Sequence, residues 1–139
     1  MDRLRGMEEA SSEPLPFHRV LVVEDDRALL ELLTEYLELR GVEVTAVQTG
    51  PAALEALAAD PFDAVVLDLR IPGLPGDQVL TRIRADPRLA QLPVAVMTGM
   101  RPGEFELVAH PDAVLSKPFD IETLSAALRD IAHAGRGNP

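Results

Sequence analysis

The sequence has 139 residues, of which 47% are hydrophobic and 26% charged, a balance typical of a single globular domain. It contains no cysteine, which excludes disulfides, cysteine-ligated zinc sites, iron–sulfur clusters and thiol nucleophiles. The formal net charge of −10 disfavours direct binding to nucleic acids and to anionic membranes. Because no apolar run approaches the length of a membrane span and the N-terminus lacks an apolar signal core, we expect a cytoplasmic protein.

Short apolar runs alternate with segments of helical period from Val20 onward, which predicts repeated β–α units and a parallel sheet. Residues 1–18 precede this pattern and lack periodicity, so we expect them to form a flexible extension. Five strands are expected, at residues 20–23, 42–47, 64–67, 94–97 and 113–115. Helices are expected at residues 27–40, 51–59, 77–85 and 121–133, with a further short helix near 103–109.

The polarity of each predicted strand indicates its place in the sheet. Residues 42–47 alternate apolar with polar side chains, as half-exposed strands at a sheet edge do. Residues 20–23, 64–67 and 94–97 are continuously apolar, which is typical of strands buried on both faces. A strand order of 2-1-3-4-5 puts these three strands in the middle, so we expect a doubly wound α/β fold.

Polar residues gather where the predicted strands end. Residues 24–26 (Glu-Asp-Asp) follow the first strand, Asp68 follows the third, Thr98 follows the fourth, and Lys117, the single lysine of the chain, follows the fifth. The carboxyl ends of parallel strands lie at one edge of the sheet, where ligands bind in open α/β folds. An acid after a strand is often only a helix cap, but the whole set together predicts a site.

Three carboxylates at one edge need a compensating charge. Two carboxylates about 5 Å apart repel by roughly 3 kcal/mol at an effective dielectric constant of about 20, so three pairs cost on the order of 10 kcal/mol. That cost rivals the whole stability of a typical domain, about 5–15 kcal/mol. We therefore expect either raised carboxyl pKa values or a bound cation, and a few oxygen ligands with room for water suit Mg²⁺.

An aspartate beside Mg²⁺ in an open crevice suggests covalent phosphoryl chemistry, because a carboxylate can attack phosphorus to form an acyl phosphate. Phosphoryl transfer depends mainly on positioning and on neutralising the phosphoryl oxygens. The Thr98 hydroxyl and the Lys117 ammonium are the groups that could supply this neutralisation. A compact ammonium at this place also explains why a chain with 13 basic residues keeps a single lysine.

At these residues the sequence resembles the response-regulator receiver domains of bacterial two-component signalling. The resemblance covers roughly residues 19–133 and rests on four motifs in register: VLVVEDD at 20–26, VVLDLRIPGLPG at 65–76, VAVMTG at 94–99 and LSKPF at 115–119. It implies a flavodoxin-like (βα)₅ fold with the strand order 2-1-3-4-5. Residues 1–18 would then be an N-terminal extension and residues 134–139 a C-terminal tail.

The resemblance also implies the roles of the clustered acids. Asp68 would accept a phosphoryl group from a phosphohistidine of a sensor histidine kinase or phosphotransfer protein, in a Mg²⁺-dependent reaction. Asp25 and Asp68 would bind Mg²⁺ directly, Glu24 would help directly or through water, and Arg70 would offer its backbone carbonyl. Asp26 would be either a more distant acid of the site or simply a helix cap.

Two further residues are implied to contact the phosphoryl group. Thr98 and Lys117 would bind its oxygens, and the bond from Lys117 to Pro118 would be cis, as is usual in the family. Pro72 and Gly76 match the family's loop after the phosphorylated strand.

Three features depart from the family. Val114 stands where receivers commonly have Tyr, Phe or His. The stretch from Thr98 to Lys117 is short and contains Pro and Gly, so a full fourth helix is not expected. Arg70 is long and basic for its position; its side chain is either solvated or folded over the site to pair with an acid or the phosphoryl group.

The sequence therefore predicts a stand-alone receiver that is not a conventional enzyme, but promotes its own phosphorylation and dephosphorylation and switches the binding of a protein target. Neither nucleic acid nor membrane is expected as a direct partner. Alternatives are a receiver fragment of a longer regulator, or an interaction module that keeps the fold and signals without phosphorylation. A metal-dependent phosphatase is a weaker alternative, because Arg70 occupies the place of its second acid.

Overall fold

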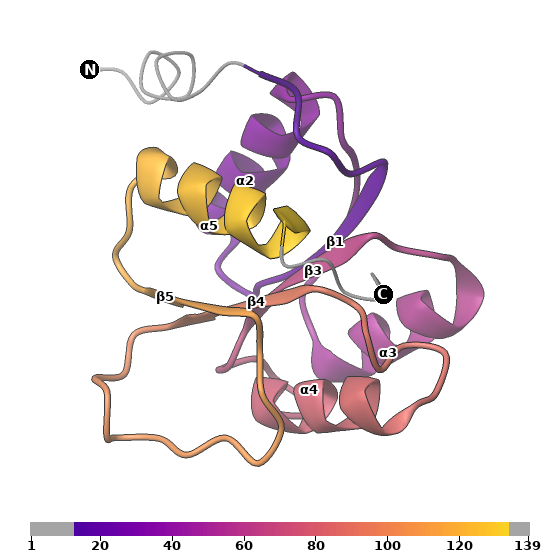
Figure 1. Ribbon diagram of the computed structural model, residues 1–139. Helices are drawn as coiled ribbons and strands as arrows, with labels where there is room; N and C mark the ends of the chain where they lie inside the picture. Colours follow the sequence, from indigo (N-terminus) through magenta and orange to yellow (C-terminus); the bar gives the residue numbers. More distant parts are fainter. Residues whose placement is uncertain (1–12, 134–139) are drawn as a thin grey trace.

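A five-stranded parallel sheet forms the centre of the molecule, in the predicted order β2-β1-β3-β4-β5. The computed structural model describes residues 13–133. Its strands are β1 (Arg19–Val23), β2 (Glu43–Val47), β3 (Ala64–Asp68), β4 (Val94–Thr98) and β5 (Ala113–Ser116). The helices of this part of the chain are α2 (Arg27–Leu39), α3 (Gly50–Ala59), α4 (Gly76–Ala85) and α5 (Ile121–His133). Because α2 and α5 cover one face of the sheet and α3 and α4 the other (Figure 1), the predicted doubly wound fold is confirmed.

Successive side chains of the central strands enter two separate cores. Val22 and Val66 pack with α2 and α5, whereas Val23 and Leu67 pack with α3 and α4. Every residue of β3 and β4 is buried, while β2 is partly exposed at the sheet edge, as its alternating sequence predicts. Because β1 and β3 pair in parallel, with Val23 opposite Leu67, the residues that follow these two strands meet at the same edge of the sheet.

Side-chain caps fix the beginnings of the helices that flank this edge. The Asp26 carboxylate accepts hydrogen bonds from the first backbone amides of α2, and the Asp120 carboxylate accepts one from the Thr123 amide of α5. Gly41 follows the end of α2 with a φ of 85°, a left-handed conformation that suits glycine. The four helices therefore start and stop within one residue of the predicted bounds.

The short helix expected near residues 103–109 does not form, so this part of the prediction is wrong. Pro102 has no amide N–H to donate, and Gly103 has a φ of 94°, which lies outside the right-handed helical region. The backbone makes a single turn instead, in which the Glu104 N–H donates to the Arg101 carbonyl at 2.9 Å. The β4–β5 segment, residues 99–112, is therefore irregular along its whole length.

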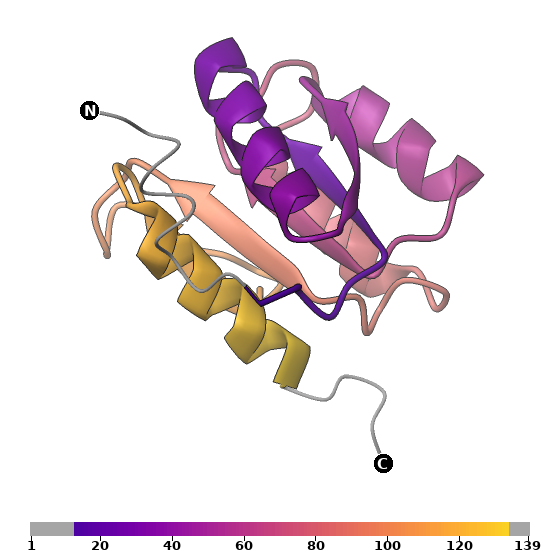
Figure 2. The ribbon, with the colours of Figure 1, turned by 90° about the horizontal axis from the view of Figure 1, so that it is seen from above.

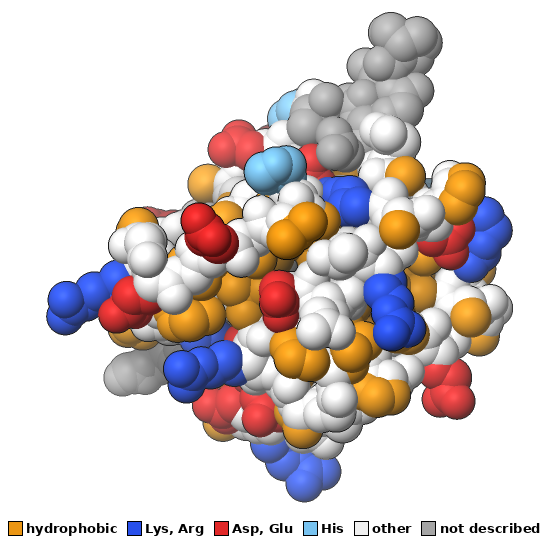
Figure 3. Space-filling view, turned by 90° about the horizontal axis from the view of Figure 1, so that it is seen from below, with side chains coloured by type: hydrophobic (Ala, Val, Ile, Leu, Met, Phe, Trp, Pro, Cys, Tyr) orange, Lys and Arg blue, Asp and Glu red, His pale blue; other side chains and the backbone are white. Residues whose placement is uncertain are grey.

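Apolar side chains of the β4–β5 segment take the place of a helix on the α3/α4 face of the sheet. Four of them are partly buried against this core: Met100, Phe105, Leu107 and Ala109. The cover is incomplete, because the Val108 residue is 89% exposed and Val114 on β5 is 47% exposed. Figure 3 shows the molecule from below, where hydrophobic side chains lie exposed among charged ones.

Arg84 on α4 holds the far end of the β4–β5 segment in place. Its guanidinium donates hydrogen bonds to the carbonyls of Leu92 at 2.7 Å and His110 at 3.0 Å, and it pairs with Asp112 at 3.0 Å. The same Asp112 oxygen accepts the Val94 amide at 2.8 Å. One largely buried ion pair thus joins α4, the start of β4 and the start of β5.

Residues 13–18, which were expected to belong to a flexible extension, pack against the domain. Leu15 and Phe17 are buried in the core between α2, α5 and the sheet. The packed part of the chain therefore begins before the expected boundary at residue 19. Residues 1–12 and the expected tail at 134–139 lie outside the described residues. Within residues 13–133, no helix is long and apolar enough to cross a membrane.

Candidate functional site

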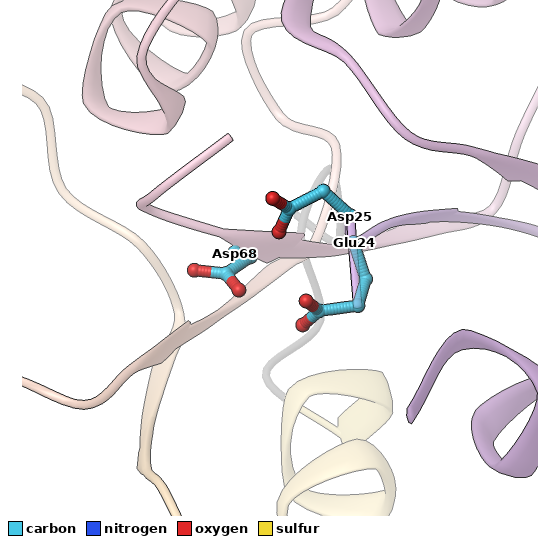
Figure 4. Close-up of side chains that lie close together, drawn as sticks. All are labelled: Glu24, Asp25 and Asp68. Atoms are coloured by element: carbon cyan, nitrogen blue, oxygen red, sulfur yellow. The ribbon is translucent and has the colours of Figure 1, made fainter. Parts of the chain in front are cut away.

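Three carboxylates meet at the carboxyl edge of the sheet, as the sequence predicts. Glu24 and Asp25 follow β1, Asp68 ends β3, and one oxygen from each side chain lies within 4.8 Å of the other two. Figure 4 shows the three groups turned toward a common space. Glu24 and Asp68 are buried and Asp25 is exposed, so the cluster opens to solvent on the side of Asp25.

Lys117 supplies the positive charge that this cluster needs. Its Nζ donates hydrogen bonds to Oδ2 of Asp68 at 2.5 Å and to Oε1 of Glu24 at 2.8 Å. The lysine lies just after β5, so its side chain reaches past the end of β4 to Asp68 at the end of β3 and to Glu24 just after β1. The bond between Lys117 and Pro118 is cis, as the resemblance implied. The single lysine of the chain is therefore an integral part of the site.

Burial and pairing shift the pKa values of these groups in opposite senses. Burial raises the pKa of Glu24 from 4.5 to about 7, and the hydrogen bond from Lys117 offsets only part of that effect. Burial would lower the pKa of Lys117, but its hydrogen bonds to Asp68 and Glu24 together raise it. The expected repulsion among the acids is thus relieved within the chain by a charged lysine and by a carboxyl group that holds its proton more firmly.

The donor set of the cluster suits a small, hard divalent cation. The Asp25 carboxylate is exposed and forms no hydrogen bond with other groups between residues 13 and 133, so both of its oxygens are available. Oδ1 of Asp68 accepts the Arg70 amide at 2.8 Å, which orients this carboxylate toward the cluster. Carboxylate and carbonyl oxygens with open positions for water are the ligands that Mg²⁺ prefers. Arg70 itself is exposed, as the interpretation of a solvated side chain expects.

Thr98 lies at the end of β4, beside Asp68 at the end of β3, and is buried. Its hydroxyl oxygen accepts the Met100 amide at 3.0 Å, and its carbonyl accepts the Lys117 amide at 2.7 Å. A hydroxyl that accepts one hydrogen bond still has a proton to donate. Sequence analysis did not foresee the link to Met100, because a hydrogen bond between a hydroxyl and a nearby amide leaves no pattern in the sequence.

Asp26 caps α2, as one of its two interpretations expects. Its carboxylate accepts the Ala28 amide at 3.0 Å and the Leu29 amide at 3.3 Å. Its own amide donates to Oε2 of Glu24 at 2.9 Å. The start of α2 therefore fixes Glu24 through the backbone, while Oδ1 of Asp26 is engaged in the helix cap.

The loop after β3 folds back closely on Asp68 and requires a glycine to do so. The Gly76 amide donates to the Leu69 carbonyl at 2.9 Å. A Cβ atom at Gly76 would lie only 2.2 Å from the Asp68 carbonyl oxygen, so any other residue would push the Asp68 backbone out of place. The PGLPG part of the motif thus shapes the edge at which Asp68 sits.

A family model described as the response regulator receiver domain matches residues 20–129. The chain belongs to this family. It is thus the receiver domain of a response regulator, a component of two-component signalling. The response regulator MprA of Mycolicibacterium vanbaalenii is 42% identical to it over 115 residues, which cover 80% of this chain and 48% of MprA. The receiver chain accordingly spans about half the length of this relative.

Solved structures support the same assignment. A sensor protein from Polaromonas sp. JS666 has a TM-score of 0.75 and 31% identity, and the match covers 84% of this receiver and 97% of that chain. The response regulator TrrA of Thermotoga maritima, solved with Mg²⁺ and BeF, has a TM-score of 0.72 and 27% identity over 82% of this receiver and 98% of TrrA. The flavodoxin-like receiver fold predicted from the motifs is confirmed.

Proposed function

We propose that this receiver is a phosphorylation-driven switch in which Asp68 accepts a phosphoryl group from a phosphohistidine. The observation that carries the proposal is the double contact of Lys117 with Asp68 and Glu24, next to the open carboxylate of Asp25. This arrangement places an acceptor carboxylate (Asp68), a carboxylate able to bind a cation (Asp25) and a positive charge (Lys117) around one solvent-accessible site. These are the parts that phosphoryl transfer to an aspartate needs.

The proposed reaction transfers the phosphoryl group in one displacement. An Asp68 oxygen attacks phosphorus while the bond from phosphorus to the donor histidine nitrogen breaks, and that nitrogen keeps the bonding electron pair. Lys117 and the free proton of the Thr98 hydroxyl stabilise the charge on the phosphoryl oxygens. Later attack by water on phosphorus releases inorganic phosphate and restores Asp68. The receiver thereby promotes its own phosphorylation and dephosphorylation rather than turning over a separate substrate.

Magnesium is the proposed cofactor. Glu24, Asp25, Asp68 and the Arg70 carbonyl would hold it, with Asp25 as the most accessible ligand. Bound Mg²⁺ neutralises negative charge on the acids and on the incoming phosphoryl group. Support comes from the oxygen-rich donor set and from TrrA, which was solved with Mg²⁺ and the phosphoryl analogue BeF.

The proposed phosphoryl donor is a sensor histidine kinase or a phosphotransfer protein. A hollow of about 420 Å³ lies beside the site, lined by Asp26, Leu29, Lys117, Pro118 and Phe119. Its mainly apolar lining gives a histidine-bearing helix a place to dock next to Lys117. We propose a protein as the downstream target and the cytoplasm as the location, with no direct contact to nucleic acid or membrane, because the net charge is −10.

A second candidate is an interaction module that keeps the receiver fold and signals without phosphorylation. The missing helix between β4 and β5 and the exposed Val114 favour it, because both alter the region next to Thr98. The proposed phosphoryl chemistry is the same for a stand-alone receiver and for the receiver part of a longer regulator.

Intact-mass spectrometry distinguishes the switch from the inert module. The chain is incubated with acetyl phosphate and either Mg²⁺ or EDTA, and the protein is weighed before the acyl phosphate hydrolyses. The proposal expects one added phosphoryl group with Mg²⁺ and almost none with EDTA. An unchanged mass in Mg²⁺ would identify the interaction module instead.

A further inference from the structure

Residues 13–17 form a strap across the α2/α5 face of the domain. The Leu15 amide donates to the Arg40 carbonyl at the end of α2, at 3.2 Å. From α5, the Arg129 guanidinium donates to the carbonyls of Glu13 at 2.7 Å and Pro14 at 3.3 Å. The strap therefore bridges the two helices before the chain enters β1. Figure 2 shows this indigo segment leading from the C-terminal part of α5 to β1.

The strap has the chemistry of a peptide ligand. Leu15 and Phe17 are buried in the core between α2 and α5, with exposures of only 5% and 7%. Pro14 precedes the first anchor and Pro16 separates the two, and proline fixes φ and has no N–H that needs a partner. An extended segment stiffened by proline loses little conformational entropy when it docks. Two apolar anchors and a few backbone hydrogen bonds then suffice to hold it.

The groove around the strap is imperfectly filled. Among residues 13–133, two side-chain atoms on this face are buried without a hydrogen-bond partner, the Tyr36 hydroxyl and Nε of Arg129. A hollow of about 340 Å³ also lies beside Phe17, between the end of α5 at Ile131 and the segment before β4 at Pro93. Buried polar atoms without partners weaken a contact, and the hollow leaves open space beside the Phe17 anchor.

We propose that the groove between α2 and α5 is a second binding site. Its ligand is an extended, proline-containing segment with two apolar side chains two residues apart. Residues 13–17 of this chain occupy the groove as a strap that can be released. The groove lies toward the C-terminal ends of both helices, whereas the acidic cluster lies at their capped N-terminal ends. Ligands of the two sites therefore do not overlap. Because the strap is part of the same chain, its effective concentration at the groove is in the millimolar range. A segment from another molecule therefore binds well only after the strap has left the groove.

A labelled peptide tests the groove in the full chain. The probe is a fluorescent peptide with the sequence of residues 13–18, Glu-Pro-Leu-Pro-Phe-His, and binding is measured by fluorescence anisotropy. The double variant Leu15→Ser, Phe17→Ser should bind it saturably, and the parent chain at least about tenfold more weakly because its own strap competes. A peptide carrying the same two serine substitutions is the matched control and should not bind. Equal binding to parent and variant, or no binding to a folded variant, would overturn the proposal.

Hydrogen exchange on the unmodified chain gives an independent test that needs no variant. If the strap is releasable, the Leu15 amide exchanges through a local opening, at least about tenfold faster than the Val66 amide in the central strand β3. Equal rates at the two amides would mean that the strap leaves only when the whole domain unfolds, and the proposal would fail. Asp68→Asn should leave peptide binding unchanged, which separates this site from the phosphorylation site.

Discussion

Lys117 donates a 2.5 Å hydrogen bond to Asp68, although the two residues are 49 positions apart and their strands, β5 and β3, are separated by β4. The contact places a positive charge beside the carboxylate that we propose as the phosphoryl acceptor. In the proposed reaction, a site preorganised in this way would need little rearrangement during phosphoryl transfer, which would lower the barrier.

Replacing Asp68 should abolish phosphorylation. We expect Asp68→Asn to gain no phosphoryl mass with acetyl phosphate and Mg²⁺, because an amide cannot form the acyl phosphate. The matched control is Asp130→Asn, which changes an exposed aspartate on α5 and should be labelled like the parent. Equal labelling of Asp68→Asn and the parent would show that another residue is the acceptor.

Replacing Asp25 should weaken magnesium binding. Replacing a residue that only hydrogen-bonds to a metal ligand typically reduces the metal affinity by about 10–100-fold. Loss of Asp25, the proposed direct carboxylate ligand, should therefore reduce the affinity for Mg²⁺ by at least about tenfold. Isothermal titration calorimetry of Asp25→Asn with Mg²⁺ measures this. Asp26→Asn is the control, because its carboxylate caps α2 and its loss should leave the affinity close to that of the parent. The assignment is wrong if the two variants bind Mg²⁺ equally well.

The acidic site should make the stability of the domain depend on pH. Because the pKa of Glu24 is about 7 in the folded chain against an ordinary 4.5, the folded state binds the proton more tightly. The resulting stabilisation is complete below pH 4.5 and is lost as pH rises through 7, by up to about 3 kcal/mol.

Urea unfolding of the parent and Glu24→Gln between pH 4.5 and 8, in EDTA, measures this effect. The variant should show a flatter profile because glutamine does not titrate, whereas Glu122→Gln, an exposed control on α5, should follow the parent. A Glu24→Gln profile as steep as that of the parent would assign the pH dependence to other groups.

Phosphoryl binding should alter the β4–β5 segment more than any other part of the fold. The Thr98 hydroxyl holds the Met100 amide at the start of this segment, so a phosphoryl group that engages Thr98 acts on it directly. Val114 has no ring to rotate inward, which leaves the segment itself as the responsive element. Hydrogen exchange with beryllofluoride and Mg²⁺ should change most within residues 99–112. Changes confined to the acidic cluster, or largest on α2, would place the output elsewhere.

Arg84 should be essential for stability because its ion pair with Asp112 joins α4 to the starts of β4 and β5. Arg84→Ala leaves the largely buried Asp112 without its ion pair and should lower the free energy of unfolding by about 3 kcal/mol or more. Arg88→Ala is the matched control; its pair with Asp86 is 3.5 Å long and largely exposed, so the expected loss is below about 1 kcal/mol. Similar urea midpoints for the two variants would contradict this role.

The sheet and the acidic cluster were predictable because local patterns determine them. Continuous apolar runs mark β1, β3 and β4, and parallel strands bring residues such as Asp25 and Asp68 to one edge whatever the details of packing. The capped starts of α2 and α5 follow from single residues in the same way. Such features depend on residues close together in the sequence and on general rules of sheet geometry.

The strap and the β4–β5 segment were not predictable by the same reasoning. Leu15 and Phe17 each follow a proline and are too few to create a period, and their burial depends on a groove formed by distant helices. Pro102 and the φ of 94° at Gly103 prevent a helix near 103–109, but where the irregular chain then runs depends on distant contacts such as those of Arg84 with Leu92 and His110. Contacts between distant residues therefore position both the strap and the β4–β5 segment.

Lys117 is also the last part of the site to be synthesised, whereas Glu24 is the first. A ribosome exposes β1, β3 and β4 before it exposes β5, so a nascent chain has its acids in place while the ammonium that pairs with them is still missing. The acids repel one another during this interval, and the arrival of the final strand relieves them. The charge balance of the acidic cluster is therefore complete only once β5, the last strand, has docked.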